Sequence, residues 1–365
     1  MSLRQAPRAA TRTCSYLQVD LELRASYGAA LAAADMGGAR ANRNCVVFDD
    51  KETCSSAERK LTVLVVSYNT RELTLACLAS VQAETRNLDY EVIVVDNASR
   101  DGTAEAVARD FPPVQLVCPE ENRGFAKANN LAAGMATGEW LLLLNPDTVI
   151  LDGAIDKALA FAAKQSGDVI VGGRTLFADG RLNPLSCHNR PTPWSVFCAA
   201  IGLARLFPGS VVFNAEALGS WKRDSVRQVD AISGCFLLIR RALWNRLGGF
   251  DESFFMYGEE TDLCLRAEKL GARCLVCPEA TLIHHGGASE RVRADKMVKL
   301  LNAKVRLVHR HWARPWRPLA HPIVLLWPLT RAAAFWIARV ARHSKSESLR
   351  PWLEVWRRRS EVIAS

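Results

Sequence analysis

The segment Leu61-Thr-Val-Leu-Val-Val66, followed by Ser67-Tyr68-Asn69, decides the fold of this chain. Its apolar, β-branched run has the length of one strand, and the polar residues after it end that strand. The pattern then repeats, with strand-like runs at 90–95, 114–117 and 140–144 and helix-like segments at 71–83, 103–110 and 126–136. Strands that alternate with helices imply βαβ units, so we predict an α/β fold with a mainly parallel sheet.

The pattern is looser after residue 147. Short strands are predicted at 169–172, 234–239, 273–276 and 281–284, with a helix at 260–270 and mostly helix after 292. The stretch 180–230 is rich in proline and is predicted to be a long, irregular loop. Such loops inside a compact domain usually have a functional role or are mobile.

Acidic residues follow two of the predicted strands. Asp96 ends the second strand, and Asp147 follows the fourth strand after Asn145 and Pro146. The carboxyl edge of a parallel sheet is where α/β folds bind ligands. Asp96 suits a hydrogen bond from the N–H of a uracil or thymine ring, and an Asx turn is its simpler interpretation.

Asp147 suits a hard divalent cation that bridges two phosphates. One carboxylate does not make a metal site, and His284 or His285 is the obvious second ligand. Histidine favours manganese over magnesium. The simpler interpretation is a turn at Asn145-Pro146-Asp147 and histidines without a ligand role.

Three carboxylates, Glu259, Glu260 and Asp262, occupy four positions at the start of a predicted helix. Acidic residues in a first turn suit the helix dipole. Three of them exceed what capping needs, and neighbouring carboxylates raise one another's pKa, as expected for a general base. We expect one of Glu259 and Asp262 to bind within the structure while the other faces a cleft, with Arg266 as the partner of Asp262.

The loop Asn122-Arg123-Gly124-Phe125 leads into a helix through a glycine that permits close backbone approach. Arg123 and Lys127 suit phosphate at this helix N-terminus. A Walker A sequence is absent, and no GxGxxG follows the first strand, which argues against a P-loop ATPase and a dinucleotide dehydrogenase.

The chain of 365 residues carries Lys+Arg 47 against Asp+Glu 38, a net charge of +9. The surplus is concentrated after residue 291, together with six tryptophans: Trp312, Trp316, Trp327, Trp336, Trp352 and Trp356. Arginine mixed with tryptophan favours a membrane surface over nucleic acid, and a solvated helical face remains the alternative. The apolar segment 319–340 is interrupted by proline and charge, short of the ~20 residues that span a bilayer, so we expect it to lie on a membrane.

The 11 cysteines have no disulfide spacing, and no signal peptide is visible. We therefore expect reduced thiols in a cytoplasmic protein, peripheral at the cytoplasmic face of the membrane. Cys274 and Cys277 are interpreted as buried thiols and not as zinc ligands. Residues 1–60 are predicted to be a poorly defined N-terminal extension.

The order of these segments resembles the family two glycosyltransferases with the GT-A fold, in particular their rhamnosyltransferase-like branch. The resemblance covers about residues 61–290 and rests on eight motifs, which are Val66-Ser-Tyr-Asn69, Val94-Val-Asp-Asn-Ala-Ser99, Glu121-Asn-Arg-Gly-Phe-Ala-Lys-Ala-Asn-Asn130, Leu144-Asn-Pro-Asp-Thr148, Ser233-Gly-Cys235, Gly248-Gly-Phe-Asp-Glu252, Tyr257-Gly-Glu-Glu-Thr-Asp-Leu-Cys-Leu-Arg266 and His284-His-Gly-Gly-Ala-Ser289. It implies a Rossmann-like, mixed but mostly parallel sheet flanked by helices over residues 61–290. A basic, Trp-rich helical extension near the membrane would follow over residues 291–365.

The resemblance also implies roles for individual residues. Glu260 is the expected base, with Glu259 kept open, since the usual Glu-Asp pair of the family is Glu-Glu here. Asp147 and His284 would hold a divalent metal, Mn or Mg, although the common Asp-x-Asp motif is reduced to Asn145-Pro-Asp147. The expected nucleotide-sugar residues are Tyr68, Asn69, Asp96, Asn97, Asn122, Gly124, Asn129 and Asn145. The expected acceptor-side residues are Ser233, Gly234 and Asp262.

The function implied is an inverting transfer of a sugar, rhamnose favoured, to a hydroxyl of a saccharide or polyprenyl-diphosphate-linked acceptor in cell-wall or surface polysaccharide synthesis. The donor would be dTDP-rhamnose first and a UDP-sugar next. Two alternatives remain: a nucleotidyltransferase that makes a nucleotide sugar, and an inactive subunit that binds a sugar or lipid carrier.

Overall fold

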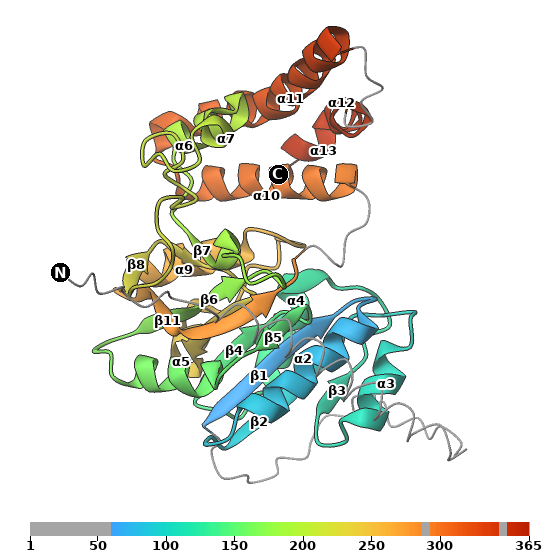
Figure 1. The fold of residues 1–365 in the computed structure, drawn as a ribbon, viewed down its shortest axis with the longest axis vertical. Coiled ribbons are helices and arrows are strands. Elements are labelled where there is room, and N and C mark those ends of the chain that lie inside the picture. Colours follow the sequence, from blue (N-terminus) through green and yellow to red (C-terminus); the bar gives the residue numbers. More distant parts are fainter. Residues whose placement is uncertain (1–59, 287–292, 343–348, 365) are drawn as a thin grey trace, which may run out of the picture.

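The computed structural model describes residues 60–286, 293–342 and 349–364 (Figure 1). The predicted N-terminal extension therefore lies outside the described residues, apart from residue 60. In the described part, a sheet of nine strands has the order β3-β2-β1-β4-β10-β6-β11-β5, and β8 pairs with β11. Its strands are β1 (Leu61–Ser67), β2 (Tyr90–Asp96), β3 (Gln115–Val117), β4 (Trp140–Leu144), β5 (Thr148–Ile150), β6 (Val169–Leu176), β8 (Arg227–Val229), β10 (Phe236–Arg240) and β11 (Arg273–His284).

The sheet is mixed, as expected. Strands β3, β2, β1 and β4 run parallel to one another, and β6 is parallel to β11. Strand β10 is antiparallel to both β4 and β6, so it joins the two parallel halves. A short second sheet pairs β7 (Cys187–His188) with β9 (Ala231–Ile232).

Helices cover both faces of the sheet (Figure 1). One face carries α2 (Arg71–Glu84), α3 (Thr103–Asp110) and α5 (Ala154–Ala163), whose apolar residues share a core with β1, β4 and β10. The other face carries α4 (Gly124–Met135), α8 (Arg241–Leu247) and α9 (Glu259–Lys269). Since every residue of β1 and β4 is buried between these layers, both strands are apolar runs without alternation.

Two features differ from the sequence prediction. The predicted strands 273–276 and 281–284 are one strand, β11, with a bulge between Val276 and Thr281. The stretch 180–230 is not one irregular loop, because it contains η1 (Pro184–Ser186), α6 (Pro193–Ile201) and α7 (Leu203–Leu206) besides β7 and β8. Helix α6 begins with a capping box between Thr192 and Ser195 and a proline in its first turn. These residues are signals for a helix start, but the prolines of this stretch were interpreted as signs of a loop.

The C-terminal helices form a layer beyond the sheet domain (Figure 1). They are α10 (Arg293–His311), η2 (Arg314–Leu319), α11 (Ala320–Arg342), α12 (Leu349–Arg357) and α13 (Arg359–Ile363). Val196 of α6 belongs to their apolar core, so a segment from the middle of the chain completes this helical unit. Trp312 and Trp352 are buried, whereas Trp316 and Trp336 are half exposed. Within the described ranges no helix combines the length and apolarity that crossing a bilayer requires.

Cys274 and Cys277 are buried in β11 as free cysteines, which confirms their interpretation as buried thiols. Burial raises the pKa of Cys277, and a hydrogen bond with Cys264 together with burial raises the pKa of Cys274. Both side chains are therefore neutral thiols at neutral pH.

A buried ionic cluster joins α9 to α10. Asp262 is fully buried and receives Arg266 Nε at 2.7 Å, His311 Nε2 at 2.8 Å and Arg310 Nη1 at 3.2 Å. Burial alone would raise the pKa of Asp262, but His311 and the arginines lower it to about 2. The predicted pairing of Arg266 with Asp262 is confirmed, and the same carboxylate fixes the sheet domain to the C-terminal helices.

Replacing Asp262 with Ala should lower the free energy of unfolding by about 3–5 kcal/mol, because Arg266, Arg310 and His311 lose a buried partner. Since the folded-state pKa is depressed, the stabilisation is present above about pH 4 and is lost as the pH falls toward 2. Urea denaturation at several pH values measures both effects. The control Asp179→Ala breaks an exposed pair with Arg181 and should leave the free energy of unfolding close to that of the wild type. Equal losses in the two variants would contradict the structural role of Asp262.

Candidate active site

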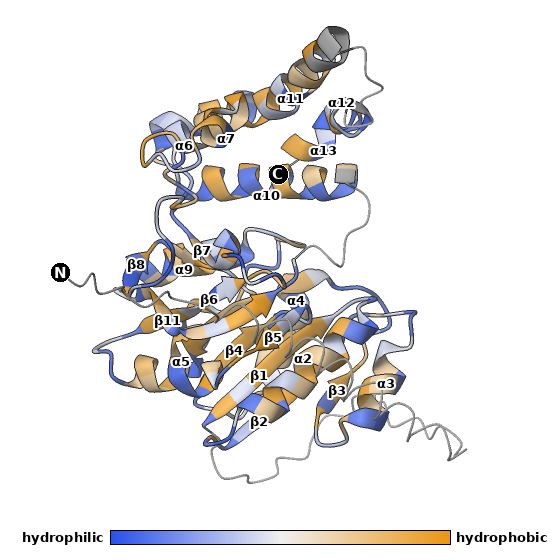
Figure 2. Ribbon diagram, viewed as in Figure 1, coloured by the Kyte–Doolittle hydropathy of each residue, from blue (hydrophilic) through white to orange (hydrophobic). Residues whose placement is uncertain are grey.

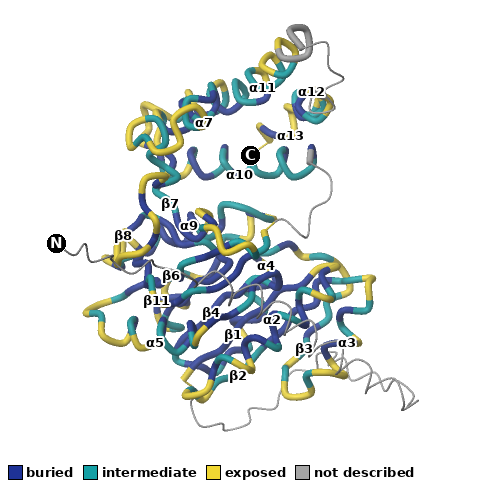
Figure 3. The backbone as a smooth tube through the Cα atoms, viewed as in Figure 1, coloured by how far each residue is buried: buried dark blue, intermediate teal, exposed yellow. Residues whose placement is uncertain are grey.

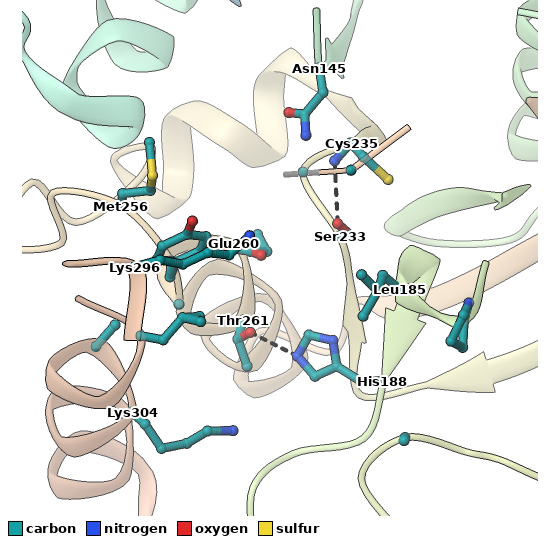
Figure 4. A pocket seen from close by; sticks show the side chains of 18 of the residues that line it. Asn145, Leu185, His188, Ser233, Cys235, Met256, Glu260, Thr261, Lys296 and Lys304 are labelled. Atoms are coloured by element: carbon teal, nitrogen blue, oxygen red, sulfur yellow. Dashed lines mark hydrogen bonds between the residues drawn. The ribbon is translucent and has the colours of Figure 1, made fainter. Parts of the chain in front are cut away.

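A cavity of about 900 Å³ opens at the carboxyl ends of β1, β2 and β4 and reaches the C-terminal helices. Figure 4 shows part of it, with Asn145 and Ser233 on one side and Lys296 and Lys304 of α10 on another. Ten of the residues expected from the sequence line it: Tyr68, Asn97, Asn122, Asn145, Asp147, Ser233, Gly234, Glu259, Glu260 and His284. Residues far apart in the chain therefore meet around one space.

The other five expected residues do not line this cavity. Asn129 donates to the carbonyl of Phe125 within α4, and Asn69 bonds the loop after β2 through Ser99 and Arg100. Asp262 has both oxygens in the ionic cluster with α10, so its geometry does not support a place on the acceptor side. Asp96 and Gly124 are next in sequence to the lining residues Asn97 and Phe125.

Asp96 is held by hydroxyl and amide groups of its own loop. It accepts Ser67 Oγ at 3.0 Å, Ser99 Oγ at 2.5 Å and the Ser99 N–H at 3.3 Å. Burial raises the pKa of Asp96, and the bonds from Ser99 and Ser67 offset part of that rise. The Asx-turn interpretation of Asp96 thus describes its contacts in this structure.

Asn97, the residue after Asp96, lines the cavity. Its Nδ2 donates to Asn122 Oδ1 at 3.0 Å, and its Oδ1 accepts the N–H of Arg123 at 2.9 Å. This pair ties the end of β2 to the start of α4, which gives the loops at this edge a fixed spacing.

Gly124 lets the start of α4 meet the segment before α9. Its φ is +78°, and a Cβ there would lie 2.4 Å from the carbonyl oxygen of Phe255. The next N–H, from Phe125, donates to that same oxygen at 2.8 Å. The glycine therefore sets how closely the Glu259 segment approaches the carboxyl edge of the sheet.

Asp147 and His284 meet where β4 leads into β5. Asp147 Oδ1 lies 3.3 Å from His284 Nε2, and Asp147 Oδ2 accepts the N–H of Gly286 at 2.9 Å. Asn145 Nδ2 is 3.5 Å from the same His284 nitrogen. Asp147 and His284 are both 7% exposed, so only a small part of each residue is accessible from the cavity that they line.

The charges of this pair are coupled. Burial opposes ionisation of Asp147, but the hydrogen bond and charge of His284 bring its pKa below the usual value. Burial likewise disfavours protonated His284, whereas Cys235 and Asp147 raise its pKa to about 10. The carboxylate and imidazole converge as two ligands of a divalent ion would, and an ion binding there must displace the imidazole proton. Around the cavity and elsewhere in the described chain, no three acidic, histidine or cysteine side chains are grouped to hold a metal.

Glu259 and Glu260 begin α9 on the opposite wall. Glu259 is 3% exposed and Glu260 is half-buried, and Oε2 of each is buried without a hydrogen-bond partner in the described chain. Burial raises the pKa of Glu259 well above its usual range, with a further contribution from Glu260, and burial also raises the pKa of Glu260. Carboxyl groups with raised pKa values that line a cavity are equipped to accept a proton.

The sequence interpretation missed part of the lining. His188 Nε2 pairs with Thr261 Oγ1 at 2.9 Å, and burial lowers the pKa of His188 to about 4, so it is a neutral ring (Figure 4). Asn183 is fully buried and donates to the carbonyl of His284 at 3.0 Å, which fixes the backbone at His284. Both residues lie in the stretch 180–230, where no periodic pattern singled them out.

Residues 62–245, which include the sheet edge of this cavity, match the family described as Glycosyl transferase family 2. The match spans half of the chain, so this protein belongs to that family and is a glycosyltransferase. This outcome speaks against the nucleotidyltransferase and the inactive binding subunit.

Individual relatives are rhamnosyltransferases, which confirms the expected branch. The chain is 30% identical over 240 residues to the N-acetylglucosaminyl-diphospho-decaprenol L-rhamnosyltransferase of Mycobacterium tuberculosis (strain ATCC 25618 / H37Rv), covering 62% of this chain and 76% of that protein. It is 40% identical over 237 residues to rhamnosyltransferase WbbL of Escherichia coli (strain K12), covering 63% and 84%. Among solved structures, mannosyltransferase PcManGT from Pyrobaculum calidifontis aligns with a TM-score of 0.49 at 21% identity, over 84% of this chain and 86% of that one.

Replacing Gly124 with Ala should cost about 1–3 kcal/mol of unfolding free energy, because φ is positive and the Cβ meets the Phe255 carbonyl. It should also reduce turnover, since the segment before Glu259 must move. Gly134→Ala in the same helix is the control, because a Cβ there meets nothing within 4 Å and Ala favours helix. Urea denaturation of both variants measures the difference, and equal stability of the two would contradict this account.

Proposed function

We propose that this glycosyltransferase is an inverting enzyme that moves a sugar, rhamnose favoured, from a nucleotide-diphosphate sugar to a hydroxyl of a saccharide or lipid-linked acceptor. dTDP-rhamnose is the first candidate donor and a UDP-sugar the next. The observation that supports the proposal is the shared cavity of Asp147, His284 and the Glu259–Glu260 pair. The rhamnosyltransferase relatives support the sugar, and the name of the Mycobacterium tuberculosis relative gives an N-acetylglucosaminyl-diphospho-decaprenol acceptor for that protein.

Glu260 is the proposed base. It is less buried than Glu259 and reaches the same cavity, so an acceptor hydroxyl can approach it. The hydroxyl proton passes to the Glu260 carboxylate while the acceptor oxygen bonds to the anomeric carbon. The bond from that carbon to the diphosphate oxygen breaks, and the nucleoside diphosphate leaves. A single displacement inverts the anomeric centre. Burial raises the pKa of both glutamates, and the charge of Glu260 raises the pKa of Glu259 further.

A divalent metal fits the Asp147–His284 side of the cavity. One carboxylate oxygen and one imidazole nitrogen converge there, a donor set that suits Mn²⁺ better than Mg²⁺. When bound, the ion supplies positive charge for the leaving diphosphate. Gly286 N–H and Asn183 orient the two side chains through Asp147 Oδ2 and the His284 carbonyl.

The proposed setting is the synthesis of cell-wall or surface polysaccharide at the cytoplasmic face of a membrane, with the protein attached peripherally. Exposed Trp316 and Trp336 in the basic C-terminal region support contact with a lipid surface. Nucleic acid is not a proposed partner.

Replacing Glu260 with Gln should lower kcat by about 10²–10⁴, because the amide cannot take the proton, while donor affinity is retained. Nucleoside-diphosphate release over a panel of donors, with and without manganese, measures turnover. The wild-type rate should fall as the pH decreases through the raised pKa of the carboxyl pair.

Glu279→Gln on β11 is the control, since Glu279 is exposed and outside the cavity. Full activity of Glu260→Gln together with an inactive Glu259→Gln would move the base to Glu259. Full activity of both variants would refute a glutamate base.

Replacing Asp147 with Asn should weaken Mn²⁺ binding by about tenfold or more, because a charged ligand becomes neutral. Electron paramagnetic resonance of free Mn²⁺ measures binding without turnover. Asp152→Asn changes an exposed carboxylate paired with Lys157 and should leave Mn²⁺ binding unchanged. Unaltered Mn²⁺ affinity in Asp147→Asn would place the metal elsewhere.

A further inference from the structure

The cavity continues past the carboxylates into a second half, which α6, α7, α10 and α11 enclose. Lys296 and Lys304 of α10, Arg205 of α7, and Trp327 and Arg331 of α11 line it. The residues expected to hold the nucleotide sugar all lie at the sheet edge. If the proposed transfer is right, the second half is free for the acceptor.

Two arginines in this half have no acidic partner. Arg331 Nη2 donates to the carbonyl of Ala199 at the end of α6 at 3.0 Å, and neither Arg331 nor Arg205 makes an ion pair with any residue of the described ranges. Burial and the nearby Arg205 charge lower the pKa of Arg331. A guanidinium carries five N–H donors, so most of those on Arg331 remain for an anion. Two adjacent, uncompensated guanidinium groups on a cavity wall suit a diphosphate.

By contrast, the two lysines are less suited to define the anion site. Lys304 pairs with Glu216, which also lines the cavity, so its charge is compensated. Lys296 stands at the beginning of α10 and lines the cavity, as do Glu259 and Glu260; Figure 4 labels Lys296 and Glu260. Arg205 and Arg331 are therefore the guanidinium groups of the second half that have no acidic partner in the described part of the chain.

An exposed apolar patch, Leu206, Phe207, Val211 and Val212, begins directly after Arg205. These side chains are 71%, 49%, 73% and 54% exposed. Phe213, which lines the cavity, has its ring 5.3 Å from that of Phe207, so the patch continues into the cavity. Figures 2 and 3 show the α7 region as hydrophobic and exposed. An apolar surface of this kind, next to a cationic pair, has the chemistry of a lipid diphosphate site.

We propose that this second half binds the prenyl-diphosphate part of a lipid-linked acceptor, with Arg205 and Arg331 on the diphosphate and the patch 206–213 on the first isoprene units. The inference rests on the proposed function and selects a lipid-linked acceptor over a free saccharide. A free saccharide would leave both the charges and the apolar patch unmatched. The acceptor sugar then extends from the diphosphate toward Glu260.

Calorimetric titration of the full chain with farnesyl diphosphate, with EDTA present, tests the site without turnover. EDTA removes any divalent ion, and so removes metal-assisted diphosphate binding beside Asp147. Arg205→Gln and Arg331→Gln should each weaken binding by about tenfold, the loss of one charge-assisted contact. Farnesol and inorganic pyrophosphate should each bind at least about tenfold more weakly than farnesyl diphosphate.

Arg86→Gln is a matched control, because Arg86 Nε donates to the Ala83 carbonyl at the end of α2 as Arg331 does to Ala199, outside the cavity. It should bind as the wild type does, and Arg331→Lys should retain most of the affinity. Thermal unfolding checks the fold of each variant, and the exposed Arg205 keeps the test valid if Arg331→Gln unfolds.

Three results would overturn the inference: no binding of farnesyl diphosphate to the wild type, wild-type affinity in both Arg205→Gln and Arg331→Gln, or pyrophosphate or farnesol binding as tightly as farnesyl diphosphate. Failure of the proposed function has a different signature, since nucleoside diphosphate would not be released from any donor while farnesyl diphosphate binding persists.

Discussion

The antiparallel pairing of β5 with the end of β11 is the constraint on which the site depends. Thr148 lies opposite His284 in this ladder, and the His285 N–H donates to the Asp147 carbonyl at 3.0 Å. The chain turns at Asn145-Pro146-Asp147, and the backbone hydrogen bond from His285 to Asp147 then joins residues 138 positions apart. Side-chain chemistry at Asp147 and His284 is a consequence of this backbone register, because a shift by one residue would turn His284 to the other face of the sheet.

The sheet edge was predictable because its signals are local. Apolar runs of strand length end at Asp96 and Asp147, and parallel strands bring their carboxyl ends together whatever the loops do. The helical half of the cavity had no such signal. Arg205 and Arg331 come from helices that meet only through tertiary packing of α6 against α11, and neither sequence neighbourhood distinguishes them from ordinary surface arginines.

The roles of the three carboxylates at the start of α9 could be predicted from the sequence only in part. The spacing of Glu259, Glu260 and Asp262 indicated that the three carboxylates have different tasks, and the structure divides them between the cavity and α10. Which carboxylate takes which task depends on His311 and Arg310, which lie some fifty residues away on another helix. The hydrogen bond with His311 and the charges of Arg266 and Arg310 lower the pKa of Asp262 to about 2, while Glu259 and Glu260 lack such partners and have raised pKa values.

This division has a mechanical consequence for the reaction. The carboxylate that anchors α9 to α10 lies two positions after the proposed base, so the position of Glu260 depends on the C-terminal helices as well as on the sheet. Lys296 and Lys304 of α10 line the cavity, and His311 of the same helix contacts Asp262. A ligand that shifts α10 in the second half of the cavity would also shift the helix that carries the base. If the acceptor binds in the second half as proposed, its binding and the placement of Glu260 are coupled through α10. Hydrolysis of the donor is then disfavoured while the second half is empty.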